Sequence, residues 1–243
     1  MLNRKDVRQS TLFEWQSISK SLGEFHLKAA SGTIRVNEII GICGMNGIGK
    51  STFLNELSRL NDLKVSVKPQ DLTRNEQEVK DFLSSSKSDA ALLDLVQEFK
   101  DKKLSQLSGG ELQKVYLVKA LSAEADLYLL DEPTAWLDVE ERLKIARLIQ
   151  QLIINKARAA FVVDHDLLFL SYVANRLIIA QGVPGIKGLL TEPLEFKQGL
   201  NQLLKTLNIT LRKDPETGRL RVNKPGSQLD AEQKKIGCWV DLS

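Results

Sequence analysis

Short apolar runs alternate with longer amphipathic segments along most of the chain. Residues 39–43, 127–130 and 159–163 carry almost no polar side chain, as expected of strands buried on both faces of a sheet. Residues 139–155 and 193–207 instead show the spacing of helices that bury one face. In the second of these helices the apolar positions i, i+3, i+4 and i+7 are Leu200, Leu203, Leu204 and Leu207. The pattern predicts an α/β fold in which helices cover a mostly parallel sheet.

Two segments depart from this alternation of strands and helices. Near the N-terminus, "EFHLKAASGTIRV" alternates apolar and polar positions around Ser31 and Gly32, which predicts a β-hairpin. The stretch after residue 70 is polar and rich in Asp, Ser and Lys, and helices are expected around 76–83 and 89–102. We therefore expect a helical insertion at about 71–122.

The C-terminal residues carry a second hairpin pattern and a cluster of basic side chains. Apolar residues alternate with polar ones on both sides of "DPETG", and the apolar set is Ile209, Leu211, Leu220 and Val222. The alternation places Arg212, Arg219 and Arg221 on the other face. From 205 to 224, six basic residues against two acidic ones leave +4, more than the +3 of the whole chain. This face is interpreted either as a surface for RNA phosphates or an acidic protein, or as a solvated strand face.

Composition and charge exclude several classes of protein. Hydrophobic residues make up 42% of the chain and charged residues 27%, which suits a globular core, and the net charge neither demands nor excludes an anionic partner. Cys43 and Cys238 lack a metal-ligand spacing, so we expect neither a disulfide scaffold nor an iron–sulfur cluster in this chain. No apolar run is long enough to cross a membrane, and the N-terminus has no apolar signal core. We expect a cytoplasmic protein without membrane insertion.

The strongest local pattern is "GMNGIGKS" at 44–51, which fits GxxxxGK[ST] between an expected strand and an expected helix. In that context backbone amides can wrap a β-phosphate, and the helix N-terminus favours its negative charge. Lys50 is expected to reach the β- and γ-phosphates, and Ser51 to ligate Mg²⁺. The alternative, a chance glycine-rich turn, is disfavoured by the strand–turn–helix context. The expected phosphate-binding residues are Gly44, Asn46, Gly47, Ile48, Gly49, Lys50, Ser51 and Thr52.

Two further segments carry candidate chemistry. "LYLLDE" is an apolar strand that ends in two carboxylates, of which Asp131 is expected to hold Mg²⁺ and Glu132 to polarise an attacking water. A solvated acidic turn is the alternative, and the phosphate loop makes it less favoured. "LSGGE" contains Ser108, Gly109 and Gly110 before a helix, where free amides suit a γ-phosphate. Taken alone, this segment is explained equally well by Ser108 as a helix N-cap and the glycines as a loop.

Taken in order, these motifs resemble those of the ABC-type ATPases. The phosphate loop is followed by "KPQ", "LSGGE", "LYLLDEP", "AWLD" and "VVDHD". The resemblance implies that the chain binds ATP and Mg²⁺ and hydrolyses the ATP. It further implies that Asp138 of the D-loop contacts nucleotide. The implied catalytic residues are Glu132, His165 as the switch histidine and Gln70 as the Q-loop residue, and the implied metal ligands are Ser51, Gln70 and Asp131. The implied fold is a P-loop NTPase domain of the ABC type with an inserted helical subdomain.

In this family two such domains pack head to tail around their nucleotides. The resemblance therefore implies that Ser108 contacts a nucleotide held by a second ABC ATPase domain. That domain is either another copy in a homodimer or a separate partner.

A narrower resemblance is to the E subfamily, the ribosome-recycling ATPases also called RNase L inhibitor proteins. "WQSISKSLGEFHLKAASGTI" is similar to the start of their second ATPase domain, and "ITLRKDPETGRLRVNK" with "DAEQKKIG" is similar to their basic hinge and C-terminal segment. The resemblance implies that Trp15 stacks on adenine and that the chain acts in ribosome recycling and translation through the small ribosomal subunit or its rRNA. We divide the chain into an ATPase domain, 1–205, and a hinge-like extension, 206–243.

The chain also departs from the subfamily pattern. It has one ATPase domain and two cysteines, where the full-length proteins have two ATPase domains and a cysteine-rich iron–sulfur domain. It is interpreted as an excised C-terminal half or as a stand-alone relative, and Met1 favours a complete product. Lys114 stands where the family often has arginine, which weakens any bidentate contact at that position.

Two other functions use the same phosphate chemistry. The chain could be the ATPase subunit of a membrane transporter, or a module that dimerises on ATP with little turnover. The tail and the short helical insertion favour the recycling function over the transporter. The complete set of expected catalytic residues favours an active ATPase over the dimerisation module.

Overall fold

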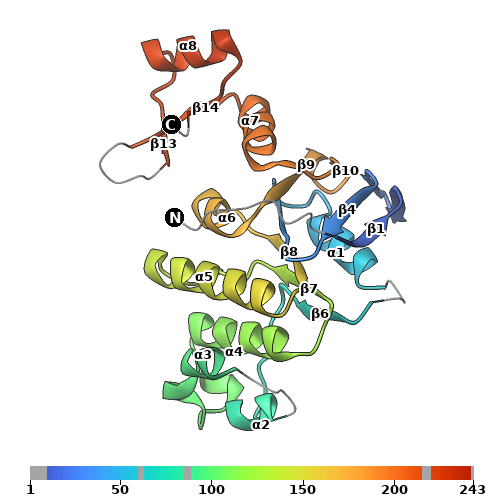
Figure 1. Cartoon of the computed structure of the whole chain (residues 1–243), viewed down its shortest axis with the longest axis vertical. Helices are drawn as coiled ribbons and strands as arrows, with labels where there is room; N and C mark the ends of the chain where they lie inside the picture. The colour runs from blue at the N-terminus through green and yellow to red at the C-terminus, as the bar shows by residue number, and fades with distance from the viewer. Residues whose placement is uncertain (1–9, 60–62, 85–88, 215–219, 242–243) are drawn as a thin grey trace.

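A mixed sheet forms the centre of the molecule (Figure 1). The computed structural model describes residues 10–59, 63–84, 89–214 and 220–241. The sheet order is β2-β3-β10-β9-β5-β8-β7-β6, and the strands from β9 to β6 run parallel to one another. These parallel strands are β9 Arg176–Val183, β5 Ile39–Gly44, β8 Ala159–Val163, β7 Leu127–Asp131 and β6 Val65–Lys68. The predicted α/β fold with a mostly parallel sheet is confirmed in this central part.

The N-terminal strands pair differently from the prediction. The elements of this region are β1 Thr11–Trp15, β2 Ile18–Leu22, β3 Phe25–Ala29, β4 Gly32–Arg35, β10 Lys187–Leu190 and β11 Leu194–Glu195. Strand β3 lies between β2 and β10, whereas β4 pairs with β1. The predicted hairpin around Ser31 and Gly32 is therefore wrong. Alternation identified both segments as strands, but the partner of a strand depends on contacts distant in sequence. One such contact is the hydrogen bond from the Ala30 amide to the Leu190 carbonyl (3.0 Å).

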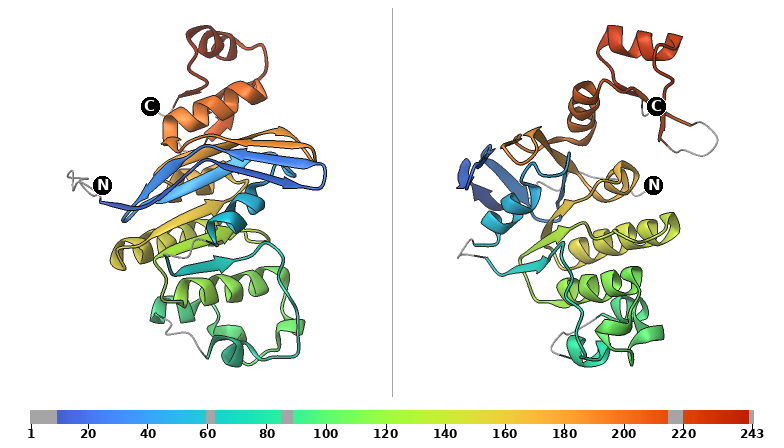
Figure 2. Two further views of the ribbon diagram at one scale, coloured as in Figure 1. Left: turned by 90° about the vertical axis from the view of Figure 1, so that its right-hand side faces the viewer. Right: turned by 180° about the vertical axis from the view of Figure 1, so that it is seen from behind.

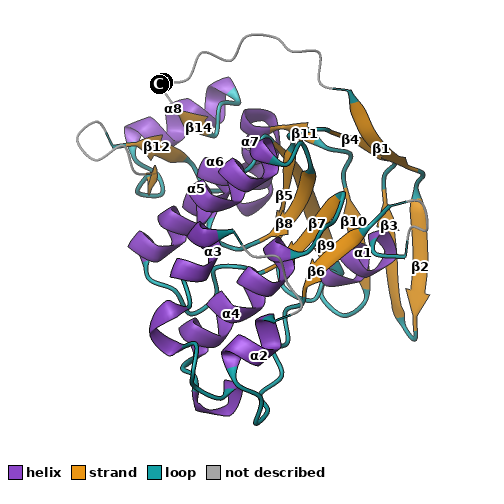
Figure 3. Cartoon of the chain, turned by 60° about the horizontal axis from the view of Figure 1, so that its bottom comes forward, coloured by secondary structure: helices purple, strands orange, loops and turns teal. Residues whose placement is uncertain are grey.

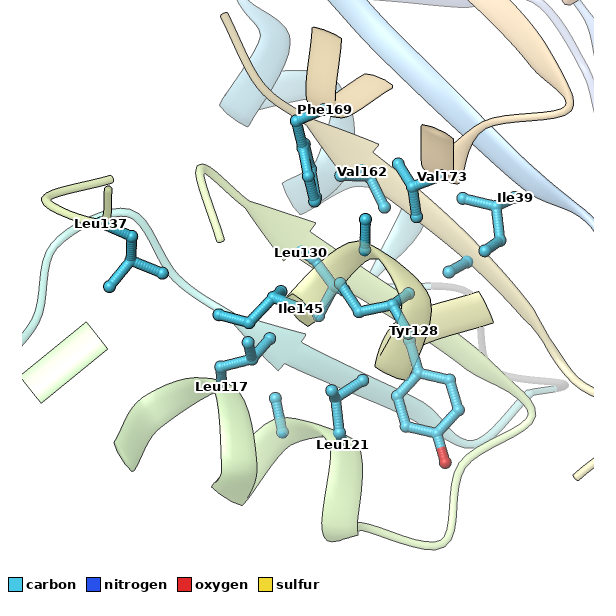
Figure 4. Close-up of a cluster of buried hydrophobic side chains, with 14 of the residues drawn as sticks. Ile39, Leu117, Leu121, Tyr128, Leu130, Leu137, Ile145, Val162, Phe169 and Val173 are labelled. Atoms are coloured by element: carbon cyan, nitrogen blue, oxygen red, sulfur yellow. The ribbon is translucent and has the colours of Figure 1, made fainter. Parts of the chain in front are cut away.

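Helices cover both faces of the sheet (Figures 1 and 3). They are α1 Lys50–Leu57 on one face, and α4 Gly109–Ser122, α5 Val139–Asn155, α6 Leu167–Val173 and α7 Phe196–Leu207 on the other. Alternate residues of β7 serve the two faces, since Leu127 and Leu129 join the core under α1 and Tyr128 and Leu130 join the core under the other helices. Figure 4 shows the latter pair with Leu117 and Leu121 of α4 and Ile145 of α5. Helix α5 has the predicted bounds, whereas α7 begins at Phe196, and its Leu207 is exposed.

The polar segment after β6 forms shorter helices than its sequence predicts. They are α2 Val79–Leu83, α3 Ala90–Asp94 and two 3₁₀ turns, Gln97–Phe99 and Leu104–Gln106. Backbone hydrogen bonds between the two ends of the segment occupy amide and carbonyl groups that a longer helix would use. The amides of Val79 and Lys80 donate to the carbonyls of Lys102 and Lys100, at 3.0 and 2.9 Å. The segment packs against α4.

The C-terminal residues form a small sheet and a helix at the end of the molecule opposite α2 (Figure 2). The elements are β12 Leu211–Lys213, α8 Gln228–Ile236, β13 Leu220–Val222 and β14 Val240–Asp241. Strands β12 and β13 pair antiparallel, as the second hairpin pattern predicts. Arg212 and Arg221 are exposed, while Arg219 lies outside the described residues. Val222, expected to face inward, is 60% exposed.

Candidate nucleotide-binding site

The phosphate loop joins β5 to α1 with backbone angles that favour glycine. Gly49 has a φ of 89°, and a Cβ there would lie 2.8 Å from Cζ of Phe25. A Cβ on Gly44, whose φ is 147°, would lie 2.1 Å from the carbonyl oxygen of Ala180. Both positions therefore require glycine. Because glycine has no side chain, a phosphate can approach the backbone of this loop closely.

The Lys50 ammonium is buried over this loop. Its Nζ donates to the carbonyl oxygens of Gly44 (3.0 Å) and Met45 (2.6 Å). Burial lowers the pKa of Lys50, and the charges of Glu132 and Asp131 oppose that shift. The ammonium is thus held beside the loop amides, where it complements a phosphate charge.

Asp131, Ser51 and Gln70 meet at the end of β7, as the resemblance implies for metal ligands. The Ser51 hydroxyl donates to Oε1 of Gln70 at 3.5 Å. Burial raises the pKa of Asp131, and a hydrogen bond from Ser51 opposes the shift. Among the described residues, Oδ1 of Asp131 is one of two buried side-chain oxygens without a hydrogen-bond partner. An unpaired buried carboxylate oxygen beside a hydroxyl and an amide oxygen fits Mg²⁺, which takes few protein ligands and keeps water and phosphate oxygens.

The described chain contains no group of three acidic, histidine or cysteine side chains placed to hold a metal.

The three predicted catalytic residues converge on one carboxylate oxygen. Oε1 of Glu132 accepts a hydrogen bond from Nε2 of Gln70 (3.1 Å) and lies 3.3 Å from Nε2 of His165. Glu132 follows β7 directly, Gln70 follows β6 and His165 follows β8, so neighbouring parallel strands deliver all three to one edge of the sheet. A carboxylate placed in this way can accept a proton from water.

Two buried polar side chains bind the backbone carbonyl of Glu132, and the sequence motifs did not assign a role to either. Nζ of Lys68 donates to the carbonyl oxygens of Asp131 (2.7 Å) and Glu132 (3.1 Å). The side-chain amide of Gln113, on α4, donates to the same carbonyl of Glu132. Burial lowers the pKa of Lys68 to about 8, against the raising effect of the nearby carboxylates. A lysine at the end of the short strand "VSVK", directly before the Q-loop, was the signal available in the sequence.

Asp164 is a further buried acid beside the site. It accepts hydrogen bonds from the Thr134 hydroxyl (2.6 Å) and the Asp166 amide (2.9 Å). Burial raises the pKa of Asp164, and these bonds oppose the shift. The acid fixes the turn that carries His165 to the loop after β7. It occurs in the quoted "VVDHD", but only its histidine was singled out from the sequence.

The signature residues cap α4. The Ser108 hydroxyl accepts a hydrogen bond from the Glu111 amide (3.2 Å), and the Ser108 amide donates to Glu111 (2.7 Å). The N-cap part of the alternative prediction is therefore confirmed, but Gly109 and Gly110 are the first residues of α4 and not a loop. Ser108 remains exposed. No hydrogen bond within the described chain joins Ser108 to the phosphate loop. Asp138 similarly caps α5, accepting from the Glu141 amide at 2.8 Å.

Gly109 and Gly110 lie against Trp136 of the D-loop. A Cβ on Gly109 would lie 3.2 Å from Cγ of the Trp136 ring, and one on Gly110 would lie 3.1 Å from the Trp136 carbonyl oxygen. Trp136 itself is 82% exposed. The signature and the D-loop thus form one continuous surface.

Trp15 does not lie where an adenine could stack on it. Only 4% of its surface is exposed, its Nε1 donates to the Ala30 carbonyl (3.0 Å), and its ring packs edge-on against Phe161. The predicted adenine contact is wrong, because pairing of β1 with β4 turns Trp15 into the core. The aromatic beside the phosphate loop is Phe25, whose half-buried ring contacts Gly49. Phe25 lies in the same quoted segment as Trp15, but sequence alone did not show which side chain faces the loop.

The ABC transporter family matches residues 60–135. The chain is 38% identical over 256 residues to translation initiation factor RLI1 of Chaetomium thermophilum, covering 97% of the chain and 42% of that protein. It is 31% identical over 170 residues to ABC transporter E family member 3 of Arabidopsis thaliana, covering 59% of the chain and 94% of that protein. A structure of ribosome-bound archaeal Pelota and ABCE1 superposes with a TM-score of 0.91 and 39% identity, over 98% of this chain and 44% of that one.

This chain belongs to the E subfamily of the ABC ATPases. Its P-loop NTPase fold of the ABC type is that of the family, and it is an ABC-type ATPase domain. The chain spans less than half the length of the RLI1 protein and of the ribosome-bound ABCE1. None of the described helices is both long and apolar enough to span a membrane.

Proposed function

We propose that this chain binds ATP with Mg²⁺ at the phosphate loop and hydrolyses it when a second ABC ATPase domain closes on it head to tail. The observation that carries the proposal is the meeting of Gln70 and His165 on one oxygen of Glu132, next to Lys50 and Asp131. Glu132 would take the proton of the attacking water, and His165 and Gln70 would orient its carboxylate.

Mg²⁺, held by Asp131, Ser51 and Gln70, would neutralise charge on the β- and γ-phosphates. Lys50 would bind the same phosphates from the loop side.

Phe25 would replace Trp15 as the aromatic next to adenine. Phe25→Ala should then weaken ATP binding in a fluorescent-nucleotide titration while leaving turnover at saturating ATP unchanged.

The second domain would supply the missing half of the site. Ser108, Gly109 and Gly110 lie exposed or partly exposed at the start of α4, unattached to the chain's own phosphate loop. Free amides at this helix N-terminus suit the γ-phosphate of a nucleotide held by the partner. That partner would be a second copy of the chain or a separate ABC ATPase domain.

We further propose that the cycle serves ribosome recycling through the small ribosomal subunit. Its support is the similarity to proteins named as translation initiation factor RLI1 and ribosome-bound ABCE1. The exposed basic residues of the C-terminal extension, 206–243, add a surface suited to rRNA phosphates. The described ones are Arg212, Arg221, Lys224 and Lys235, and the exposed Lys205 directly precedes the extension.

The test compares wild type with Glu132→Gln, and with Glu98→Gln as a matched control on an exposed carboxylate far along the chain. Glu132→Gln should lower ATP turnover to a small residual rate, while the control keeps the wild-type rate. On sucrose gradients with ATP, Glu132→Gln should sediment with small ribosomal subunits, because closed sites would not be emptied. Equal turnover in all three proteins would remove Glu132 from the reaction. Turnover without subunit binding would leave an ATPase of another role, and recovery with a membrane permease would assign it to transport.

A further inference from the structure

The peptide that carries Glu132 has an unusual backbone conformation. Its φ is 46°, in the left-handed region that side chains other than glycine rarely adopt. Such a conformation persists where surrounding contacts over-determine it. Backbone bonds supply part of the restraint, because the Glu132 amide donates to the Val163 carbonyl at 2.9 Å.

The Ala135 amide also donates to the Glu132 carbonyl (3.3 Å), and two side-chain donors reach the same carbonyl. Lys68 ends β6, the strand next to β7, and its Nζ bridges the successive carbonyl oxygens of Asp131 and Glu132 at 2.7 and 3.1 Å. Gln113 lies on the first turns of α4 and donates to the carbonyl of Glu132. Both side chains are 1% exposed. Thus the segment that leads into Gln70 and the helix that Ser108 caps both bind the Glu132 carbonyl.

A buried lysine usually lies against a carboxylate, since an unpaired buried charge is unfavourable. In the described part of the chain Lys68 forms no ion pair, and its ammonium hydrogen bonds go to backbone carbonyls. A methionine of similar length could fill this space, but it would remove the lysine donor from both carbonyl oxygens, and the Glu132 carbonyl would keep its bonds from Gln113 and the Ala135 amide. The residue type is thus explained by the need to fix these carbonyls.

We propose that Lys68, assisted by Gln113, is a positioning residue for Glu132. It holds the Glu132 peptide in the left-handed conformation, so that the carboxylate meets Gln70 and His165. This inference rests on the proposed function, in which Glu132 activates water, and it assigns to Lys68 no contact with nucleotide.

The test is a double-mutant cycle of Lys68→Met with Glu132→Gln. Lys68→Met should lower kcat on the order of 100-fold, as expected for a displaced reacting group, and leave the ATP dissociation constant within about twofold. In the Glu132→Gln background the same substitution should leave the residual rate unchanged, because the residue that it positions is already inactive. A purely structural role would lower both rates alike.

Lys156→Met is the matched control. Lys156 also donates its Nζ to a backbone carbonyl, that of Leu121 at 3.0 Å, away from the site. It should lose stability without losing turnover. Gln113→Met removes a side-chain amide but no charge, and it should lower kcat less than Lys68→Met does. This variant tests the proposal if Lys68→Met does not fold.

A crystal structure of the Lys68→Met or Gln113→Met protein decides the inference independently of turnover. The Glu132 φ should leave the left-handed region, or its carboxylate should move away from His165. Unchanged Glu132 geometry, or an unchanged kcat in an active protein, would overturn the positioning role. Wild-type protein that fails to hydrolyse ATP with a partner domain would instead overturn the proposed function, and the crystal structure would still decide the role of Lys68.

Discussion

Asp131, at the end of β7, and Asp230, on α8, are both almost fully buried, with 5% and 3% of their surfaces exposed. Asp230 accepts hydrogen bonds from the Thr210 hydroxyl (2.7 Å) and the Gly226 amide (2.9 Å), and it pairs with Lys234 (3.0 Å). These bonds lower its pKa to about 2. Asp131 has one oxygen without a partner among the described residues, and burial raises its pKa.

The difference separates a structural acid from the acid that we propose binds a ligand. Around Asp230 the buried side-chain amides also find hydrogen-bond partners. Asn223 donates to the Thr210 hydroxyl (3.0 Å), and Gln233 donates to the Leu211 carbonyl (3.1 Å). Such a satisfied network stabilises the C-terminal fold. Asp131 is placed at a cost to the folded state, which fits an oxygen that completes its coordination only when Mg²⁺ and nucleotide bind.

The largest expected effect is on turnover. Asp131→Asn should lower the ATPase rate at saturating Mg²⁺ and ATP on the order of 100-fold or more, because it removes the charge of the proposed metal ligand. Asp230→Asn, which changes an acid of similar burial, should change that rate by less than about twofold. Steady-state phosphate release measures both. Similar losses in the two variants would mean that buried aspartates matter to this protein through folding alone.

The second effect is on stability without ligands, where the two variants should differ in sign. Asp230→Asn places an NH₂ group against the Thr210 hydroxyl or the Gly226 amide, so the melting temperature should fall by several degrees. Asp131→Asn removes a poorly satisfied buried charge, so the melting temperature should stay the same or rise. Calorimetry of the nucleotide-free proteins measures the shifts. A fall in Asp131→Asn equal to that in Asp230→Asn would contradict the contrast.

The sequence predicted which residues meet at this edge of the sheet better than it predicted how the N-terminal strands pair, for a physical reason. Asp131, Glu132 and His165 stand at the ends of apolar runs, Gln70 follows the short strand β6, and neighbouring parallel strands end at the same edge of a sheet. Local patterns therefore bring these residues together without any knowledge of loops.

The errors lie where the partner of a residue is distant in sequence. The alternation in β3 and β4 does not say that β4 pairs with β1, and without that pairing the burial of Trp15 does not follow. Likewise, Lys68 and Gln113 gain their role only from the carbonyl of Glu132, which lies more than sixty residues from one of them.

The two aspartates should also respond to pH in opposite directions. The Asp230 pKa falls from 3.8 to about 2, so its contribution to stability is complete above about pH 4 and is lost as the pH falls through 2. The Asp131 pKa is raised, so the folded protein binds this proton more readily than the unfolded chain does. Its carboxylate therefore destabilises the fold as the pH rises above 3.8 and through the raised pKa.

Urea unfolding of wild type and both variants between about pH 6 and pH 3 measures these contributions. The wild-type advantage over Asp230→Asn should shrink towards the acid end. Any wild-type deficit relative to Asp131→Asn should also shrink there. Differences that stay constant with pH would show that neither carboxyl has a shifted pKa.

The smallest effect separates charge from hydrogen bonding at Asp230. Lys234 lies 3.0 Å from the carboxylate, but its side chain is 27% exposed, so the pair is open to water. Lys234→Met should lower the melting temperature by no more than about 2 °C, since Thr210 and Gly226 still bond Asp230. Lys235→Met, on the neighbouring exposed residue, is the matched control, and the difference between the two should vanish at high salt. A fall as large as that of Asp230→Asn would mean that the lysine charge, and not the hydroxyl and amide donors, holds this acid in its buried place.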